Sequence, residues 1–252
     1  MKISVIVCTR NEEGFVDACL TSILNAISKH RPYEIYVIAD RCTDRTAEKC
    51  KRYPVEIVEK RWKHWANSGA ESIAMGLELA RGKYIALIRM DMTVPLNFFD
   101  VLLPMLKGEV ACVSPLVVTY PEGLPNRIVH AKEKMYSVAP LGRGTYGIKI
   151  VTKRAMDEIK GPRDVWGADT DVDMRLEQKG YEYLFVPSVK VFHHQKMTLR
   201  YIITKQLRSG RARRMIKYGF LRTVAHAIFR LRPFVVVGWL IGTKSNMRKH
   251  EV

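Results

Sequence analysis

The sequence predicts an α/β fold with a mostly parallel sheet flanked by helices, and three observations support this. Short apolar runs alternate with helical stripes through the first ninety residues. The segments between successive apolar runs are long enough for right-handed crossovers through a helix. Hydrophobic residues make up 47% of the chain and charged residues 27%, so disordered and collagen-like classes are excluded.

The predicted elements follow in order along the chain. Apolar runs predict strands over residues 3–8, 34–39, 55–58 and 84–88. Between the strands, apolar periodicity predicts helices over 16–27, 43–53 and 68–80. Further on, the pattern predicts a helix over 98–106, a strand over 110–118, an irregular polar stretch, a helix over 170–179, and extended segments over 183–186 and 189–192.

The formal net charge of +17 is concentrated at the C-terminal end. Fifteen of the 42 Lys and Arg residues follow residue 182, against a single acid, Glu251. Residues 183–252 therefore carry +14, and the preceding residues carry only +3. The protein is a nearly neutral body with a cationic end.

This cationic end is predicted to be helical and amphipathic. Apolar residues recur at helical spacing, with basic residues on another face of the same helix. Pro233 is expected to end this helix, and the apolar run 234–242, which contains Trp239, follows it. Such a basic, Trp-containing segment is typical of a membrane interface. The alternative is that this apolar surface packs against the rest of the chain or a second subunit.

Other composition signals concern the compartment and the partners. The chain opens without a secretory signal, and no stretch approaches the ~20 apolar residues of a membrane-spanning helix. Five cysteines without a CxxC pair indicate reduced thiols. We expect a cytoplasmic protein held peripherally on the cytoplasmic membrane face. Nucleic acid is not expected as a partner, because aromatic residues are not interleaved with the basic ones.

Polar residues directly follow three of the predicted strands. Thr9, Asn11 and Glu12 follow the first, Asp40 the second and Asp91 the fourth. A single aspartate in such a place is usually a helix cap or a turn residue. The carboxyl ends of parallel strands, however, meet at one edge of a sheet, where such folds bind ligands. Their recurrence at this edge therefore predicts a site.

Five segments, in the right order and at suitable spacing, resemble the motifs of glycosyltransferase family 2. They are SVIVCTRNEE, YVIADRCTDRT, GAESIAMGLELARGKYIALI, IRMDMTVP and WGADTDVDMRLEQKGYEYLFVPSVKVFHH. The resemblance covers roughly residues 2–200 and implies a GT-A fold, which is Rossmann-like, and a nucleotide-sugar donor. It divides the chain into a GT-A-like domain over 1–200 and a basic, amphipathic and apolar C-terminal segment over 201–252.

The resemblance also implies where the donor binds. Thr9, Asn11, Glu12 and Asp40 fall where the family holds the nucleotide base and ribose. A carboxylate suits this role because it accepts hydrogen bonds from a base N–H. The departure here is Ala39, which stands at the position of the family's first aspartate in this segment.

The metal position departs from the family at Arg89. Asp91 matches the last aspartate of the DxD motif, which contacts a divalent metal, Mg²⁺ or Mn²⁺, bridging the donor diphosphate, and His193 falls where a late histidine approaches that metal. Arg89 replaces the first aspartate. Either its guanidinium binds phosphate oxygens and takes over part of the metal's charge neutralisation, or it points away and leaves Asp91 as the sole carboxylate. In the first case Arg89 joins the nucleotide-sugar-binding residues.

Asp169 aligns with the catalytic aspartate of the family. An inverting transfer needs one base that takes the proton of the acceptor hydroxyl. Asp171 and Asp173 are expected to be acidic residues at the start of a helix instead. We therefore expect an inverting, hexosyltransferase-type enzyme that moves a sugar from a nucleoside-diphosphate donor to an acceptor hydroxyl or phosphate, including a lipid-linked one.

Two further interpretations follow from the motifs. Ala74 and Ala168 also depart from the family, so a catalytically impaired relative acting as a membrane- or polyanion-binding protein is the alternative function. Gly142, Gly144 and Gly147 fit the pattern GxGxxG, but an extended run follows them, so they predict a loop near the acceptor and not a dinucleotide site.

Overall fold

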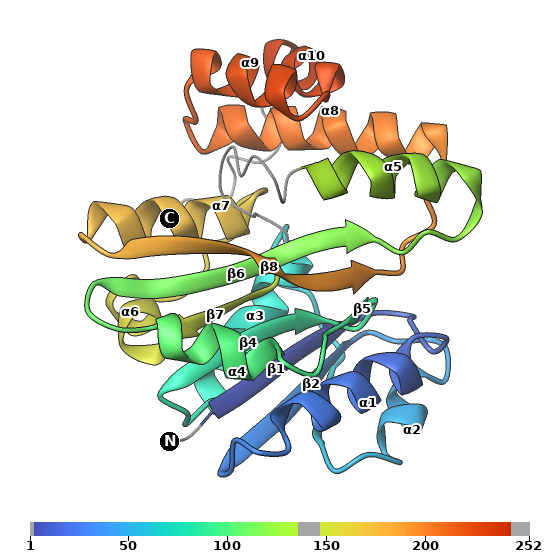
Figure 1. Cartoon of the computed structure of the whole chain (residues 1–252), viewed down its shortest axis with the longest axis vertical. Helices are drawn as coiled ribbons and strands as arrows, with labels where there is room; N and C mark the ends of the chain where they lie inside the picture. Colours follow the sequence, from blue (N-terminus) through green and yellow to red (C-terminus); the bar gives the residue numbers. More distant parts are fainter. Residues whose placement is uncertain (1–2, 136–146, 243–252) are drawn as a thin grey trace.

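An eight-stranded sheet with helices on its faces forms the centre of the computed structural model, which describes residues 3–135 and 147–242 (Figure 1). Its strands are β1 (Ile3–Thr9), β2 (Tyr33–Asp40), β3 (Glu56–Lys60), β4 (Tyr84–Arg89), β5 (Met92–Thr93), β6 (Val110–Thr119), β7 (Lys149–Thr152) and β8 (Glu182–His193). The helices are α1 (Val16–Ile27), α2 (Thr46–Cys50), α3 (Ser68–Leu79), α4 (Phe98–Leu102), α5 (Gly123–Met135), α6 (Lys153–Glu158), α7 (Ala168–Gln178), α8 (Leu199–Met215), α9 (Phe220–Phe229) and α10 (Pro233–Ile241), with a 3₁₀ turn η1 (Leu103–Met105).

The half of the sheet built from the N-terminal part of the chain is parallel. The strand order is β3-β2-β1-β4-β7-β6-β8-β5, and β1 pairs in parallel with β2 and β4, as β2 does with β3. β6 and β8 are also parallel, whereas β7 is antiparallel to β4 and β6, and β5 to β8. The predicted α/β class is confirmed, and the parallel half brings the C-terminal ends of β1, β2 and β4 to one edge.

The core explains why the first strands read as apolar runs. β1 is covered on both faces, so that consecutive residues such as Val5, Ile6 and Val7 are fully buried. The predicted stripe of α1 faces this core through Val16 and Leu20, together with Ile23 and Ile27 further along the helix.

Three elements differ from the sequence prediction. The stretch expected to be irregular forms α5, because two buried polar side chains hold it by hydrogen bonds: Asn126 Nδ2 donates to Tyr120 O (2.9 Å), and Glu133 Oε2 accepts from Thr119 N (2.6 Å). The two late extended segments join in β8 across an irregularity in its pairing with β6. Pro233 does not end a helix but begins α10, since proline is tolerated at the first helical position.

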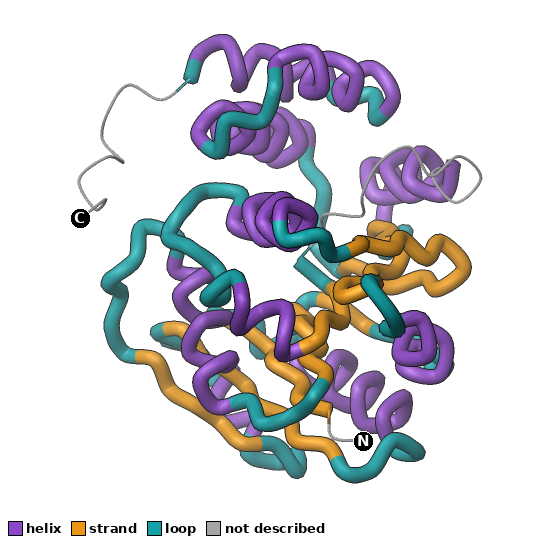
Figure 2. The backbone as a smooth tube through the Cα atoms, turned by 90° about the vertical axis from the view of Figure 1, so that its left-hand side faces the viewer, coloured by secondary structure: helices purple, strands orange, loops and turns teal. Residues whose placement is uncertain are grey.

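α8, α9 and α10 form a helical layer at one end of the molecule, with α9 and α10 on the side of α8 that faces away from the sheet (Figures 1 and 2). α8 and α10 approach closely: a Cβ atom at Gly210 would lie 2.0 Å from Val235 O, and one at Gly238 would lie 2.2 Å from Leu207 O. Only glycine allows this contact. The boundary expected at residue 200 falls in the first turn of α8 and stays a prediction.

Two other expectations concern the described part of the chain. Among the helices it contains, none combines the length and the apolar character needed to cross a bilayer. Of the GxGxxG glycines, Gly142 and Gly144 lie outside the described residues, while Gly147 lies two residues before the start of β7.

Candidate active site

The loops that follow β1 and β2 are bound to each other. Asn11 Oδ1 accepts a hydrogen bond from Thr43 N (2.8 Å), and Glu12 N donates to Thr46 Oγ1 (2.8 Å). Within the first loop, the buried Thr9 donates through Oγ1 to Glu12 Oε2 (2.9 Å). The predicted base- and ribose-binding residues Thr9, Asn11 and Glu12 therefore lie together on one preorganised surface.

Asp40, at the end of β2, is held by a network of buried charges. Lys60 Nζ lies 3.2 Å from Asp40 Oδ1 and 2.6 Å from Glu71 Oε2, and its side chain is completely buried. Ser68 and Arg41 also donate to the Asp40 carboxylate, at 2.5 and 2.8 Å. Burial raises the pKa of Asp40, but these hydrogen bonds outweigh it and lower the pKa to about 2. Asp40 is thus an oriented, ionised acceptor.

Asp91 lies two residues beyond β4, and its carboxylate is bound by a guanidinium group and an imidazole ring. Its Oδ2 is 2.9 Å from Arg89 Nη2 and 2.9 Å from His193 Nε2, while its Oδ1 is buried and has no hydrogen-bond partner among the described residues. Burial raises the pKa of Asp91, but the hydrogen bond from His193 and the charge of Arg89 bring it below its ordinary value. Arg89 therefore points toward Asp91, not away from it.

Glu12 lies close enough to Asp91 to be affected by its charge. Burial and the negative charge of Asp91 raise the pKa of Glu12 to about 7. The carboxyl group is therefore partly protonated near neutral pH and is able to donate as well as accept a hydrogen bond. This coupling also places the β1 loop next to the end of β4.

The free oxygen of Asp91 is where a divalent cation fits. Mg²⁺ is often held by one or two carboxylates, with phosphate oxygens and water completing the shell. Within residues 3–135 and 147–242, no group of three or more His, Cys, Asp or Glu side chains is arranged to hold a metal alone. His193 Nε2 is engaged with Asp91 and would have to give up that hydrogen bond to become a ligand. The residues thus suit a cation bound mainly through a phosphorylated ligand.

Asp169 stands in the first turn of α7, next to two aspartates that are committed to ion pairs. Asp171 accepts from Arg175 Nε (2.8 Å) and from Arg163, and the fully buried Asp173 pairs with Lys149 of β7. Lys149 Nζ also lies 3.5 Å from the backbone oxygen of Asp169. Asp171 and Asp173 therefore fasten α7 to its surroundings, and Asp169 remains half-buried at the helix start.

The loop before α7 is bound to the residue before α3, next to Asp40. Asp164, in the loop before α7, accepts from Asn67 N (2.8 Å), directly before Ser68, which donates to Asp40. At the end of β4, Gly147 lies beside the Arg89 side chain. A Cβ atom built on Gly147 would be 3.9 Å from Arg89 Cδ. The structure therefore places the predicted donor residues along one edge of the sheet, and the loop that leads to Asp169 lies beside Asp40 at that edge.

Some residues of this site are absent from the sequence prediction. Lys60 and Lys149 were not expected, because a lysine at the end or start of a strand carries no signal until its buried partners are known. Tyr201 and Lys205 of α8 were also missed. Burial raises the pKa of Tyr201 and lowers that of Lys205, and the charges of Arg89 and Asp91 also act on both side chains.

Solved structures with this arrangement define the class of fold. A mannosyltransferase from Pyrobaculum calidifontis, in complex with GDP-Man and Mn²⁺, superposes with a TM-score of 0.64 at 19% identity, covering 94% of this chain and 69% of that one. Staphylococcus aureus TarS (residues 1–349) in complex with UDP-GlcNAc gives 0.63 at 13% identity, covering 93% and 75%. These neighbours are GT-A glycosyltransferases, so the fold is GT-A, as predicted.

The sequence relationship is more specific. The model of glycosyltransferase family 2 matches residues 4–157, more than half of the chain. The chain belongs to this family, which confirms the resemblance on which the site residues were chosen.

Two curated relatives are similar over shorter stretches. The uncharacterized glycosyltransferase YibD of Escherichia coli (strain K12) is 33% identical over 106 residues, which are 41% of this chain and 30% of that protein. The poly(ribitol-phosphate) beta-glucosyltransferase of Bacillus spizizenii is 28% identical over 98 residues, 36% of this chain and 15% of that protein. The chain thus matches less than a third of the length of either relative.

Proposed function

We propose that the chain transfers a sugar of the hexose type from a nucleoside-diphosphate donor to an acceptor hydroxyl or phosphate, with inversion at the anomeric carbon. The observation that carries this proposal is the gathering of the donor residues at the ends of β1, β2 and β4, with the loop before α7 bound beside Asp40. The ligands named for the similar structures, GDP-Man with Mn²⁺ and UDP-GlcNAc, support it.

The donor is held in two parts. Thr9, Asn11, Glu12 and Asp40 bind the base and the ribose, with Asp40 as a permanently ionised acceptor. The diphosphate lies beyond β4, where the guanidinium of Arg89, 44% exposed, donates to its oxygens.

Asp91 is the residue that would hold Mg²⁺ or Mn²⁺, through Oδ1. When bound, the cation neutralises the negative charge of the diphosphate. His193 orients Asp91 by its hydrogen bond to Oδ2, and Arg89 supplies a positive charge that belongs to the protein itself.

Asp169 acts as the general base. Its carboxylate takes the proton of the acceptor hydroxyl while the oxygen attacks the anomeric carbon, and the nucleoside diphosphate leaves from the opposite face. The charge that develops on the leaving group is stabilised by Arg89. Asp171 and Asp173 cannot take this role, because their oxygens bind arginine and lysine side chains.

A donor screen tests the proposal. UDP-, GDP- and dTDP-sugars are offered to the wild type and to Arg89→Ala, with and without Mn²⁺ or Mg²⁺, and donor binding and hydrolysis are measured. We expect one donor class to be used, and about tenfold weaker binding in Arg89→Ala, the usual cost of a lost charged hydrogen bond. This loss should be smaller when Mn²⁺ is present.

The matched control is Arg81→Ala, at the opposite end of β4, which should behave like the wild type. If metal dependence were the same in Arg89→Ala and wild type, Arg89 would have no part in charge neutralisation. If no donor bound under any condition, the chain would be an impaired relative and the transfer proposal would be wrong.

We also propose that the C-terminal helices hold the protein on the cytoplasmic face of a membrane, which would bring it to lipid-linked acceptors. α9 (Phe220–Phe229) leaves apolar side chains exposed: Leu221 and Ile228 are 81% and 65% exposed, whereas His226 bonds Arg213 of α8 (3.1 Å) and Arg230, directly after the helix, is buried. α10 likewise exposes Phe234, Val237, Leu240 and Ile241. Apolar surface beside a strong positive charge suits anionic lipid.

Vesicle flotation checks this proposal. Wild type should float with vesicles containing anionic lipid and be released by high salt, and the double variant Ile228→Glu/Leu240→Glu should stay in solution. Leu96→Glu removes an equally exposed apolar side chain (71%) from the body and should still float. Equal flotation of all three proteins would show that this apolar surface serves another purpose, such as contact with a second subunit.

A further inference from the structure

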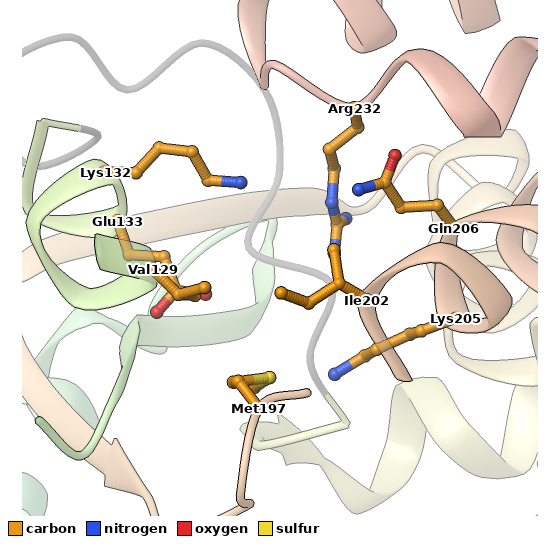
Figure 3. A pocket seen from close by; sticks show the side chains of 8 residues that line it. All are labelled: Val129, Lys132, Glu133, Met197, Ile202, Lys205, Gln206 and Arg232. Atoms are coloured by element: carbon orange, nitrogen blue, oxygen red, sulfur yellow. The ribbon is translucent and has the colours of Figure 1, made fainter. Parts of the chain in front are cut away.

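A pocket outside the donor residues lies between α5 and α8 and is closed by Arg232, the residue before α10 (Figure 3). Lys132 of α5 and Lys205 of α8 direct their amino groups into it from two sides, and the guanidinium of Arg232 enters from a third (Figure 3). Apolar side chains complete the wall. Three segments far apart in the sequence thus bring three cations together.

The positive charge of the pocket is only partly compensated by the described residues, since the charge of one carboxylate, Glu133, acts on both lysines. Its one carboxylate, Glu133, accepts a hydrogen bond from Thr119 N (2.6 Å) and so serves to hold α5. Within residues 3–135 and 147–242, no carboxylate forms an ion pair with Lys132, Lys205 or Arg232. The pocket therefore has an excess of positive charge.

The cations are close enough to repel one another. Burial and the charges of Arg232 and Arg89 lower the pKa of Lys205 to about 8. Burial and the charge of Arg232 also lower the pKa of Lys132. An anion between them would relieve this repulsion and take up three charged donors at once.

A buried amide adds a neutral polar group to the same place. Gln206 follows Lys205 on α8, is 5% exposed, and lies beside Arg232 in the pocket (Figure 3). Its Oε1 has no hydrogen-bond partner among the described residues. A buried polar group without a partner is costly. Because Oε1 only accepts hydrogen bonds, a hydroxyl group or a water molecule, and not a phosphate oxygen, would satisfy it.

We propose that this pocket is a binding subsite for a phosphate group carried by the acceptor. The cavity volume is about 30 Å³, which leaves room for a small anionic group and not for a nucleoside. Met197, which lines the pocket, follows His193 by four residues, and His193 binds Asp91, so the pocket lies next to the donor site. The charges of Arg89 and Asp91 also act on Lys205. An acceptor anchored here by its phosphate would lie beside the donor diphosphate.

The assignment to the acceptor depends on the proposed transferase function, whereas phosphate binding itself does not. The test is therefore a binding titration of the full chain with three probes: inorganic phosphate, glycerol 3-phosphate and the nucleoside diphosphate of the preferred donor. Lys132→Met and Arg232→Met keep an apolar stem and remove one charge each. Arg127→Met, an exposed position also on α5, is the control.

We expect wild type to bind phosphate and glycerol 3-phosphate in competition with each other, with no competition from glycerol. Lys132→Met and Arg232→Met should each weaken this binding about tenfold or more, and Arg127→Met should not change it. Nucleoside diphosphate binding should be unaffected by all three substitutions, and weakened by Arg89→Ala.

Each other outcome is decisive. Phosphate binding that survives both pocket substitutions would overturn the subsite. If both substitutions weakened phosphate and nucleoside diphosphate equally, the pocket would belong to the donor and the acceptor assignment would be wrong. If wild type bound phosphate but no nucleoside diphosphate, the transferase proposal would fail while the phosphate site would stand.

Discussion

Asp169→Asn is expected to reduce sugar transfer by about 10²- to 10⁴-fold, the usual contribution of a general base. The amide keeps the shape of the side chain but cannot take a proton. The residue lies half-buried at the start of α7, and its neighbours Asp171 and Asp173 are fixed in ion pairs and cannot replace it. The measurements are the initial rate of sugar transfer and the dissociation constant of the donor, each compared between wild type and Asp169→Asn.

Donor binding should be unchanged in Asp169→Asn, because the donor residues lie on β1, β2 and β4. Asp157→Asn makes the same chemical change at an exposed position of α6, where the carboxylate pairs with Lys153, and should leave the rate as it is. Normal turnover in Asp169→Asn would refute its role as base. A fall in donor affinity equal to the fall in rate would indicate a binding role instead.

Lys60→Met is expected to lower the free energy of unfolding by about 3–5 kcal/mol, as found when one partner of a buried ion pair is removed. Its ammonium group is wholly buried between Asp40 and Glu71, and both carboxylates would lose their charge partner. Urea unfolding at neutral pH measures the change. Donor binding should fall as well, since Asp40 would no longer be held in its orientation.

Two further variants show whether the effect of Lys60→Met comes from the loss of the buried charge pairs. Lys63→Met removes an exposed lysine three residues away and should change stability by no more than about 0.5 kcal/mol. Lys60→Met combined with Asp40→Asn and Glu71→Gln removes the buried charges together and should recover part of the loss. A fall below about 1 kcal/mol in Lys60→Met would mean that water or a shifted side chain replaces the ammonium group.

In the C-terminal segment, the periodic pattern predicted the helices but not the face that each of them buries. The sequence indicated helices and an amphipathic stripe, and α9 is such a helix, but which face is buried could not be read from it. Arg213 binds His226 and Arg230 is buried, while the apolar residues Leu221 and Ile228 remain outside. In α5 the sequence signal was weak because buried hydrogen bonds of Asn126 and Glu133, not an apolar stripe, hold the helix.

The sequence by itself determined the parallel half of the sheet and the family, because apolar runs and strand-end motifs are local patterns. The same patterns placed Thr9, Asp40 and Asp91 at one edge, since neighbouring parallel strands end together. Only the tertiary structure decided that Arg89 faces Asp91, that Lys60 and Lys149 hold buried carboxylates, and that Lys132, Lys205 and Arg232 share a pocket. The physical reason is that charge pairing depends on distance in space, and most of these partners come from elements far apart along the chain.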